Sequence, residues 1–339
     1  MKALVYTDTE RIEWRDVAEP VPGPGQCVVE VAYSCICGSD MHAYHGQDSR
    51  RVPPLVLGHE AVGTVAGGRL AGKRVVINPL MTCGTCAACR GGREHLCANR
   101  ELIGMRVAGA FAERVAVDEA CLTELPDDLA FDQAAITEPL ACAIHTVDIG
   151  LARLAGPMDK AKAVVLGGGA IGLLSALVFA RRGIGELWIA ETNPHRQAIL
   201  RETVKARVYT PGSDDPDGTP PEEAVDIVLD AVGSGATRAA ASRLAAPGGT
   251  IVHIGLQNQQ DGLDTRRLTL QEIAFIGTYC YTRADFAEAV GMLSDGLIRR
   301  DGWTEVRRLA DGAGGFADID SGKAPPKILL KTGGTSGQD

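Results

Sequence analysis

The sequence has 339 residues, of which 45% are hydrophobic, and it carries a net charge of −9 with a pI near 5.4. This length exceeds one ordinary domain and predicts two domains, each with its own core. The negative charge argues against a polyanion-binding surface, so we expect no nucleic-acid partner. No apolar stretch is long enough to cross a bilayer, so we expect no membrane partner either.

The beginning of the chain has the sequence pattern of β-strands. Residues 1–6 resemble a first strand rather than a signal peptide, because charged residues follow them at once, and we therefore expect a cytoplasmic protein. The strand-like runs are 2–6, 10–16, 27–33, 61–66, 74–77 and 111–117. From 131 to 154 apolar residues recur every three or four positions, which predicts helix.

Strands and helices alternate after about residue 156. The expected strands are 162–166, 186–191, 206–210, 225–230, 249–255 and 272–278, and the expected helices are 170–183, 194–205, 235–245 and 283–295. This order predicts an α/β fold with a doubly wound parallel sheet. The polar stretch 211–221 is expected to be a surface loop. The final strand, 327–331, has no helix after it, which suggests that the chain returns to the first domain.

A glycine-rich turn joins an apolar strand to an apolar helix. It contains Gly167, Gly169 and Gly172, with Ala170 and Ile171 at the start of the helix. Glycines here permit a tight turn and a close approach of the backbone to a pyrophosphate, which the helix N-terminus binds through its N–H groups. The same letters can also mark nothing more than a closely packed turn.

Glu191 strengthens the dinucleotide interpretation. It follows the apolar run 187–190, about twenty residues beyond the glycines, where an acidic residue bonds the ribose hydroxyls. A carboxylate there repels a 2′-phosphate, which favours NAD over NADP, although Arg196 nearby is a feature that NADP would use. A solvated loop carboxylate is the alternative for Glu191.

Four cysteines crowd into one loop with the spacing C-x2-C-x2-C-x7-C: Cys83, Cys86, Cys89 and Cys97. Four thiolates this close match a tetrahedral structural zinc site with no open position. Two disulfides are the alternative, disfavoured without a secretory signal. An iron–sulfur cluster is another, but Cys97 does not follow the bacterial ferredoxin spacing.

Candidate ligands for a second metal come from three separate segments. Cys37 follows the third strand, His59 stands in a Gly-His-Glu sequence, and Glu138 begins the expected helix. A catalytic zinc takes three protein ligands and keeps one position open, which such a set supplies. Each residue alone could equally be a buried thiol, a capped histidine or a carboxylate at a helix N-terminus.

These motifs together resemble the zinc-containing medium-chain dehydrogenase/reductase family, and within it the polyol branch with sorbitol, xylitol, L-idonate and galactitol dehydrogenases. CGSDMH, GHE, the cysteine quartet, EPLAC and GGGAIG occur in the family's order over nearly the whole chain. The resemblance implies a GroES-like catalytic domain at 1–148 with a zinc lobe at about 80–100. It also implies a Rossmann domain at 149–284 and a return to the catalytic domain at 285–339, disordered from about 332.

The resemblance also implies roles for single residues. Cys37 and His59 would be zinc ligands, with Glu138 and Glu60 as alternating carboxylate ligands or as a holder of bound water. Cys142 stands where the alcohol dehydrogenase branch has its third ligand, but the EPL sequence favours Glu138. Ser39 would accept the proton of the alcohol and His42 would pass it to solvent, a relay that a hydroxyl and a histidine can perform near neutral pH.

The substrate position departs from the sorbitol enzyme. Where that enzyme has an arginine beside a tyrosine, this chain has Tyr279, Cys280 and Tyr281. The cationic contact is therefore missing, which argues against sorbitol itself; Tyr44, Tyr279 and Tyr281 are candidates to line the substrate pocket.

We therefore expect two zinc ions per chain, one catalytic and one structural, and an NAD-dependent oxidation of a polyol or sugar-derived secondary alcohol to the ketone. The alternatives are a threonine-type or simple alcohol dehydrogenase on the same scaffold and a nucleotide-binding protein without catalysis. The family likeness suggests a homodimer or homotetramer that pairs through the edge strand near 272–278.

Overall fold

The computed structural model describes residues 1–213, 218–257 and 260–333. The chain divides into two compact units, Met1–Glu138 with Thr282–Asp339, and Pro139–Tyr281. The divisions expected from the sequence lie after residues 148 and 284. Helix α4 (Thr137–Leu151) continues without a break across the first division, and its Gly150 packs against Ile227 and Val252 of the second unit. Helical periodicity does not indicate which unit such residues join.

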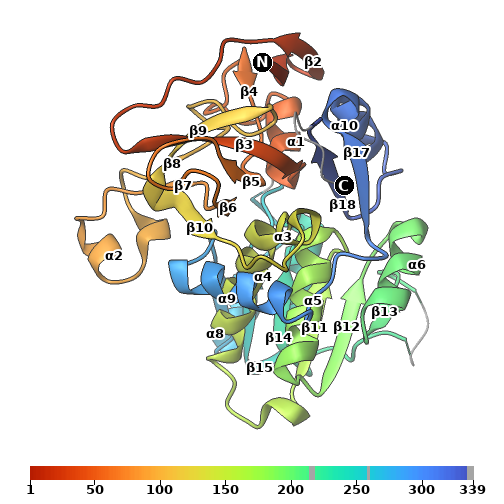
Figure 1. Cartoon of the computed structure of the whole chain (residues 1–339). Coiled ribbons are helices and arrows are strands. Elements are labelled where there is room, and N and C mark those ends of the chain that lie inside the picture. Colours follow the sequence, from red (N-terminus) through yellow and green to blue (C-terminus); the bar gives the residue numbers. More distant parts are fainter. Residues whose placement is uncertain (214–217, 258–259, 334–339) are drawn as a thin grey trace. The chain divides into compact units, whose positions relative to one another are not determined.

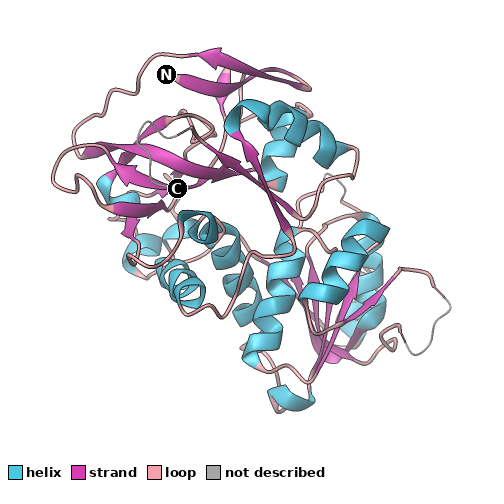
Figure 2. Cartoon of the chain, turned by 45° about the vertical axis from the view of Figure 1, so that its right-hand side comes forward, coloured by secondary structure: helices cyan, strands magenta, loops and turns pink. Residues whose placement is uncertain are grey.

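The first unit is rich in β-structure, visible as magenta strands in Figure 2. Its strands are β1 (Lys2–Asp8), β2 (Arg11–Asp16), β3 (Gln26–Cys35), β4 (Leu55–Val56), β5 (Glu60–Val65), β6 (Arg74–Ile77), β7 (Leu80–Met81), β8 (Glu101–Leu102), β9 (Arg114–Asp118), β10 (Leu122–Glu124), β17 (Thr304–Arg308) and β18 (Lys327–Lys331). Its helices are α1 (Gly38–Tyr44), α2 (Ala87–Arg90), α3 (Phe131–Ala134), α9 (Arg283–Ser294) and α10 (Gly312–Asp320), with 3-10 turns at Glu94–Leu96, Glu119–Cys121 and Leu309–Asp311.

The main sheet of this unit has the order β10-β6-β5-β3-β18-β17, and β9 also pairs with β3. Alternate residues of β3, such as Val29 and Val31, are buried, as expected for a sheet with one face on a core. β18 lies antiparallel to β3, with Leu329 opposite Cys35, and parallel to β17. The end of the described chain therefore completes the sheet that the beginning of the chain starts.

The second unit is the predicted doubly wound parallel sheet, with the order β13-β12-β11-β14-β15-β16 and every pairing parallel. Its strands are β11 (Lys162–Leu166), β12 (Glu186–Ala190), β13 (Arg207–Tyr209), β14 (Val225–Asp230), β15 (Ala245–His253) and β16 (Ala274–Gly277). Its helices besides α4 are α5 (Ala170–Arg182), α6 (Pro194–Thr203), α7 (Gly235–Leu244) and α8 (Thr265–Leu270), and a 3-10 turn spans Met158–Lys160. Figure 1 shows α5 and α6 beside these strands.

The central strands of this sheet are buried on both faces. Ala163, Val164 and Val165 of β11 have no exposed surface, which is why the strand reads as an apolar run without alternation. Of the polar loop expected at 211–221, residues 214–217 lie outside the described residues, as does the expected frayed tail from 334 on. Within the described ranges, no helix has the length and apolar character needed to cross a membrane.

Candidate active site and metal centres

The short helix α1 places Cys37 and Ser39 at the end of strand β3. Cys37 caps the helix, and its backbone N–H donates to the Asp40 carboxylate at 3.0 Å. Because Asp40 has no exposed surface and one oxygen committed to this bond, it fixes the turn at which the chain leaves the strand. Cys37 is thereby held at the beginning of the helix, with Ser39 two residues further on.

Cys37, His59 and Glu60 come together although two of them are more than twenty residues from the first. One ligand atom from each lies within 4.8 Å of those of the other two. Gly58, before His59, has φ +93° and lies where a Cβ would come within 2.5 Å of the Phe111 ring, so only glycine fits this approach. A thiolate, an imidazole and a carboxylate are the ligand types that zinc takes in catalytic sites, so the donor set fits that metal.

Asp40 also faces the imidazole of His59, with Oδ1 3.5 Å from Nδ1. Burial raises the pKa of Asp40, but His59 and Arg51 outweigh this and bring it below its usual value. For His59, burial lowers the pKa, and Asp40 and Cys37 more than reverse the effect and raise it well above its usual value. Since Nδ1 faces the carboxylate, the other ring nitrogen is the one available to a metal.

Glu60 has a buried partner that its local sequence does not indicate. Lys327, on β18, donates from Nζ to both carboxylate oxygens of Glu60 at 2.8 Å and to the carbonyl of Ile36 at 3.2 Å. Both side chains of the pair are almost completely buried. Burial lowers the pKa of Lys327, and Glu60 more than compensates, so the pKa is raised. The lysine therefore fixes the position of the Glu60 side chain next to Cys37 and His59.

The remaining residues expected at this site lie in different surroundings. Glu138 is buried in the first turn of α4, but among the described residues it is not part of the Cys37 group. Cys142, also on α4, is buried. His42 is on the exposed side of α1, with Nδ1 3.4 Å from the Gln47 side-chain oxygen.

Ser39 has a partner that was not expected. The guanidinium of Arg51 donates to the Ser39 hydroxyl oxygen at 3.2 Å and to the Ser39 carbonyl at 2.9 Å. Nothing in the local sequence pattern distinguishes Arg51 from its neighbour Arg50, because the contact forms only when the loop after α1 folds back on the helix. Arg51 of that loop therefore holds both the backbone and the side chain of Ser39.

The candidate pocket tyrosines differ in exposure. Tyr44 is partly buried, with its ring 5.4 Å from that of Phe316 between centroids, and burial raises its pKa. Tyr279 is partly exposed and Tyr281 is 1% exposed. Tyr44 belongs to the first unit and the other two to the second.

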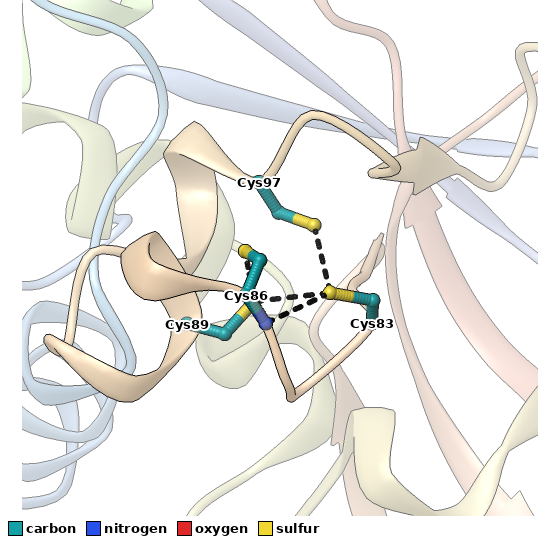
Figure 3. Close-up of side chains that lie close together, drawn as sticks. All are labelled: Cys83, Cys86, Cys89 and Cys97. Carbon is teal, nitrogen blue, oxygen red and sulfur yellow. Dashed lines mark hydrogen bonds between the residues drawn. The ribbon is translucent and has the colours of Figure 1, made fainter.

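The four clustered cysteines form the second candidate metal centre (Figure 3). Cys83 Sγ lies 3.5 Å from Cys97 Sγ and 3.9 Å from Cys89 Sγ, and Cys86 Sγ lies 3.5 Å from Cys89 Sγ. Backbone N–H groups of Thr85 and Cys86 lower the pKa of Cys83 to about 6, so one thiol is already close to the thiolate form. This closed set of four sulfurs fits a structural zinc.

This lobe is tied to helix α9. The buried Glu94, between Cys89 and Cys97, accepts a hydrogen bond at 2.6 Å from the backbone N–H of Arg283, the first residue of the helix. A carboxylate at a helix N-terminus is favourable, because it satisfies a free N–H group and faces the positive end of the helix dipole. The lobe therefore braces the start of the C-terminal segment.

In the second unit, the glycine turn and Glu191 lie together as expected for a dinucleotide site. A Cβ on Gly172 would come within 1.8 Å of the Gly167 carbonyl oxygen, so the helix approaches the turn as closely as glycine alone allows. Gly169 is the N-cap residue of α5, and Ala170 and Ile171 form its first turn. The N–H groups in the first turn of α5 are the ones that would bind a pyrophosphate.

The carboxylate of Glu191 is fixed by the backbone around it. It accepts from the N–H of Gly168 at 2.9 Å, of Thr192 at 2.7 Å and of Asn193 at 2.8 Å. It is 7% exposed and directly follows β12. Arg196 lies in the first turn of α6, and its Nε has no hydrogen-bond partner among the described residues.

Two family descriptions match separate parts of the chain. The family description "Alcohol dehydrogenase GroES-like domain" matches residues 23–127, and "Zinc-binding dehydrogenase" matches residues 170–295. Together they cover more than half of the chain. The GroES-like and Rossmann-like fold expected from the motifs is confirmed.

Individual relatives agree with these matches. The chain is 32% identical over 322 residues to 2-dehydro-3-deoxy-L-galactonate 5-dehydrogenase of Pseudoalteromonas atlantica, covering 91% of this chain and 92% of the relative. It is 29% identical to L-threonine 3-dehydrogenase of Deinococcus radiodurans, with the same coverage of 91% and 92%. A zinc-binding dehydrogenase of Sinorhizobium meliloti bound to NADP is 30% identical with a TM-score of 0.84, covering 97% of this chain and 98% of that structure. The chain is thus an oxidoreductase that belongs to the zinc-dependent medium-chain dehydrogenase family.

Proposed function

We propose that this protein oxidises a secondary alcohol of a polyol or sugar-derived compound to the ketone, with NAD as the hydride acceptor. The observation that carries the proposal is the grouping of Cys37, His59 and Glu60 at the start of the helix that contains Ser39. The 32% identical relative, named for action on a sugar acid with several hydroxyl groups, supports this substrate class.

A zinc ion held by Cys37, His59 and a carboxylate supplies Lewis-acid activation of the alcohol oxygen when bound, and NAD supplies the hydride acceptor. Asp40 faces Nδ1 of the His59 ring, and Lys327 holds the Glu60 side chain in place through both of its oxygens. Ser39 accepts the proton of the alcohol, and His42, on the exposed side of α1, releases it to solvent. The cysteine quartet holds a second, structural zinc.

The test is NADH formation across a panel of polyols, sugar acids, threonine and ethanol, with NAD or NADP and with or without a chelator. We expect activity on polyols or sugar acids with NAD that the chelator abolishes. Activity on threonine or ethanol and no polyol would contradict the proposed substrate. Absence of turnover in a protein with its full metal content would support a nucleotide-binding protein without catalysis.

Oxidation of threonine is the second candidate, and the 29% identical threonine dehydrogenase relative favours it. Threonine is also a secondary alcohol, so the same metal centre and Ser39 serve both reactions. The two differ in what recognises the rest of the substrate, which is why the panel has to include both classes.

Glu191 sets the cofactor preference in this proposal. Replacing Glu191 by glutamine keeps an oxygen that can accept from Gly168 but removes the charge that repels a 2′-phosphate. We expect the ratio of kcat/KM with NAD to that with NADP to fall about tenfold, equivalent to about 1.4 kcal/mol. The same ratio measured for Glu202→Gln, an exposed carboxylate near the end of α6, is the control and should not change. An unchanged ratio in Glu191→Gln would show that this carboxylate does not select the cofactor.

We also propose that the protein is a homodimer or homotetramer. Strand β16 lies at the end of the parallel sheet, and Phe275 on it is 37% exposed. A strand edge of this kind can pair with a second copy of itself. Replacing Phe275 by proline should shift the sedimentation coefficient toward that of a single chain, whereas an unchanged assembly would place the interface elsewhere.

A further inference from the structure

The buried Arg51 lies beside the proposed proton acceptor. Arg51 is 3% exposed, and its guanidinium contacts both the backbone and the side chain of Ser39. Its Nε also donates to the carbonyl oxygen of Gly104 at 3.1 Å. The side chain is therefore held in one orientation by groups from two separate loops and from helix α1.

The positive charge of Arg51 is compensated within the protein. Nη1 donates to Asp48 at 2.9 Å, and Nη2 lies 4.0 Å from Asp40. Because two carboxylates surround the guanidinium and solvent hardly reaches it, its charge is not offered to an anionic substrate. The contribution of the guanidinium to the site is a hydrogen bond of fixed direction to Ser39.

That direction is determined by the chemistry of the two groups. A guanidinium only donates hydrogen bonds, whereas a hydroxyl has one hydrogen to donate and two lone pairs that accept. In the contact between Arg51 and Ser39, the hydroxyl oxygen must be the acceptor. One lone pair of Ser39 is then occupied, and one lone pair and the hydrogen remain.

A proton relay through a hydroxyl uses the remaining lone pair and the hydrogen. The O–H bond of the alcohol breaks as its proton reaches the free lone pair of Ser39, and the original O–H bond of Ser39 breaks as its proton passes on toward solvent. Without Arg51 the hydroxyl could rotate so that its hydrogen pointed away from the path of the proton. In that orientation the relay would be interrupted.

We propose that Arg51 is a positioning residue that orients the hydroxyl of Ser39 for proton transfer. This inference rests on the proposed function. A positioning role requires that the effect of Arg51 on turnover depend on the Ser39 hydroxyl. A purely structural role of Arg51 in the loop does not require this.

The experiment is a double-mutant cycle of Arg51→Lys and Ser39→Ala in the full-length protein, with kcat and KM measured on the best alcohol of the panel. Lysine keeps the charge, but a single ammonium cannot reach the contacts of the planar guanidinium together. We expect Ser39→Ala to lower kcat about 100-fold and Arg51→Lys about tenfold, with little change in either KM. In the Ser39→Ala background, Arg51→Lys should have no further effect on kcat.

Two further proteins serve as controls. Ser39→Thr retains a hydroxyl and should retain both most of the activity and the sensitivity to Arg51→Lys. Arg50→Lys alters the neighbouring arginine, which contacts Asp48 from an exposed position, and should leave kcat unchanged. Metal content and melting temperature are measured for every protein. After treatment with the chelator, the changes in melting temperature caused by Arg51→Lys and by Ser39→Ala should also be non-additive in the double variant, because the Arg51–Ser39 contact is made within the protein.

The outcomes separate the two proposals. If the protein oxidises an alcohol but the two substitutions lower kcat by independent factors, Arg51 does not act through Ser39, and only this inference fails. If Arg51→Lys lowers the metal content in proportion to kcat, its role is structural and the inference also fails. If the unmodified protein with its full metal content oxidises no alcohol, the proposed function and the inference fail together.

Discussion

Replacing Cys37 by serine should lower kcat/KM for the oxidised alcohol by about 10³-fold or more. A Lewis-acid metal contributes several kcal/mol to the stabilisation of developing charge, and each 1.36 kcal/mol is a factor of ten in rate. Cys37 supplies the sulfur of its group with His59 and Glu60, and a serine hydroxyl is a much poorer zinc ligand. The metal content should fall by one ion per chain, measured by elemental analysis of the purified protein.

The matched control is a cysteine of the other centre. Cys97→Ser should also remove one metal ion per chain. Its main effect should be a lower melting temperature of the first unit, and it should lower kcat/KM much less than Cys37→Ser does. The reason is that the quartet holds a lobe braced on α9 through Glu94. A Cys37→Ser protein with two metal ions and full activity would show that the catalytic centre lies elsewhere.

Replacing Lys327 by methionine should lower the free energy of unfolding by about 3–5 kcal/mol, because Glu60 would then be a buried carboxylate without its counter-charge. Both side chains are at most 2% exposed, so water cannot replace the lost contact. The measurement is calorimetric unfolding, in which the transition of the first unit should move to lower temperature. Two transitions are to be expected from two units, so each is followed separately.

Two variants check the cause. Glu60→Gln combined with Lys327→Met removes both charges and should recover part of the lost stability, since no unpaired ion remains. Lys331→Met alters an exposed lysine of the same strand and should change stability by no more than about 0.5 kcal/mol. If Lys327→Met and Lys331→Met have equal effects, the buried pair contributes little to stability.

The sequence predicted the parts of the molecule in which local pattern and local chemistry coincide. The strand 162–166 and the strand 225–230 were predicted at their observed bounds, because parallel strands buried on both faces leave uninterrupted apolar runs. The cysteine quartet is similarly local. For Cys37 and His59 the ligand types were recognisable, and the fold brings them together.

Other features depend on contacts between distant segments. Helix α10 was not predicted, because the sequence Gly312–Asp320 has three glycines; what orders it is Phe316, which is fully buried with its ring 6.0 Å from that of Phe111. Lys327 and Arg51 were missed for the same reason. A lysine in a strand and an arginine in a loop are ordinary surface residues until their partners are known, and neither partner is a sequence neighbour.

The insertion of β18 between β3 and β17 has a consequence for how the chain folds during synthesis. The nucleotide-binding unit, 139–281, contains every strand of its own sheet and can fold as soon as that segment has left the ribosome. The first unit begins earlier but cannot close its sheet until residues 327–331 are available, so its pairings have a high contact order. Because Lys327 arrives with that strand, Glu60 lacks this partner until residue 327 has been synthesised, and we therefore expect the group of Cys37, His59 and Glu60 to be completed late in folding.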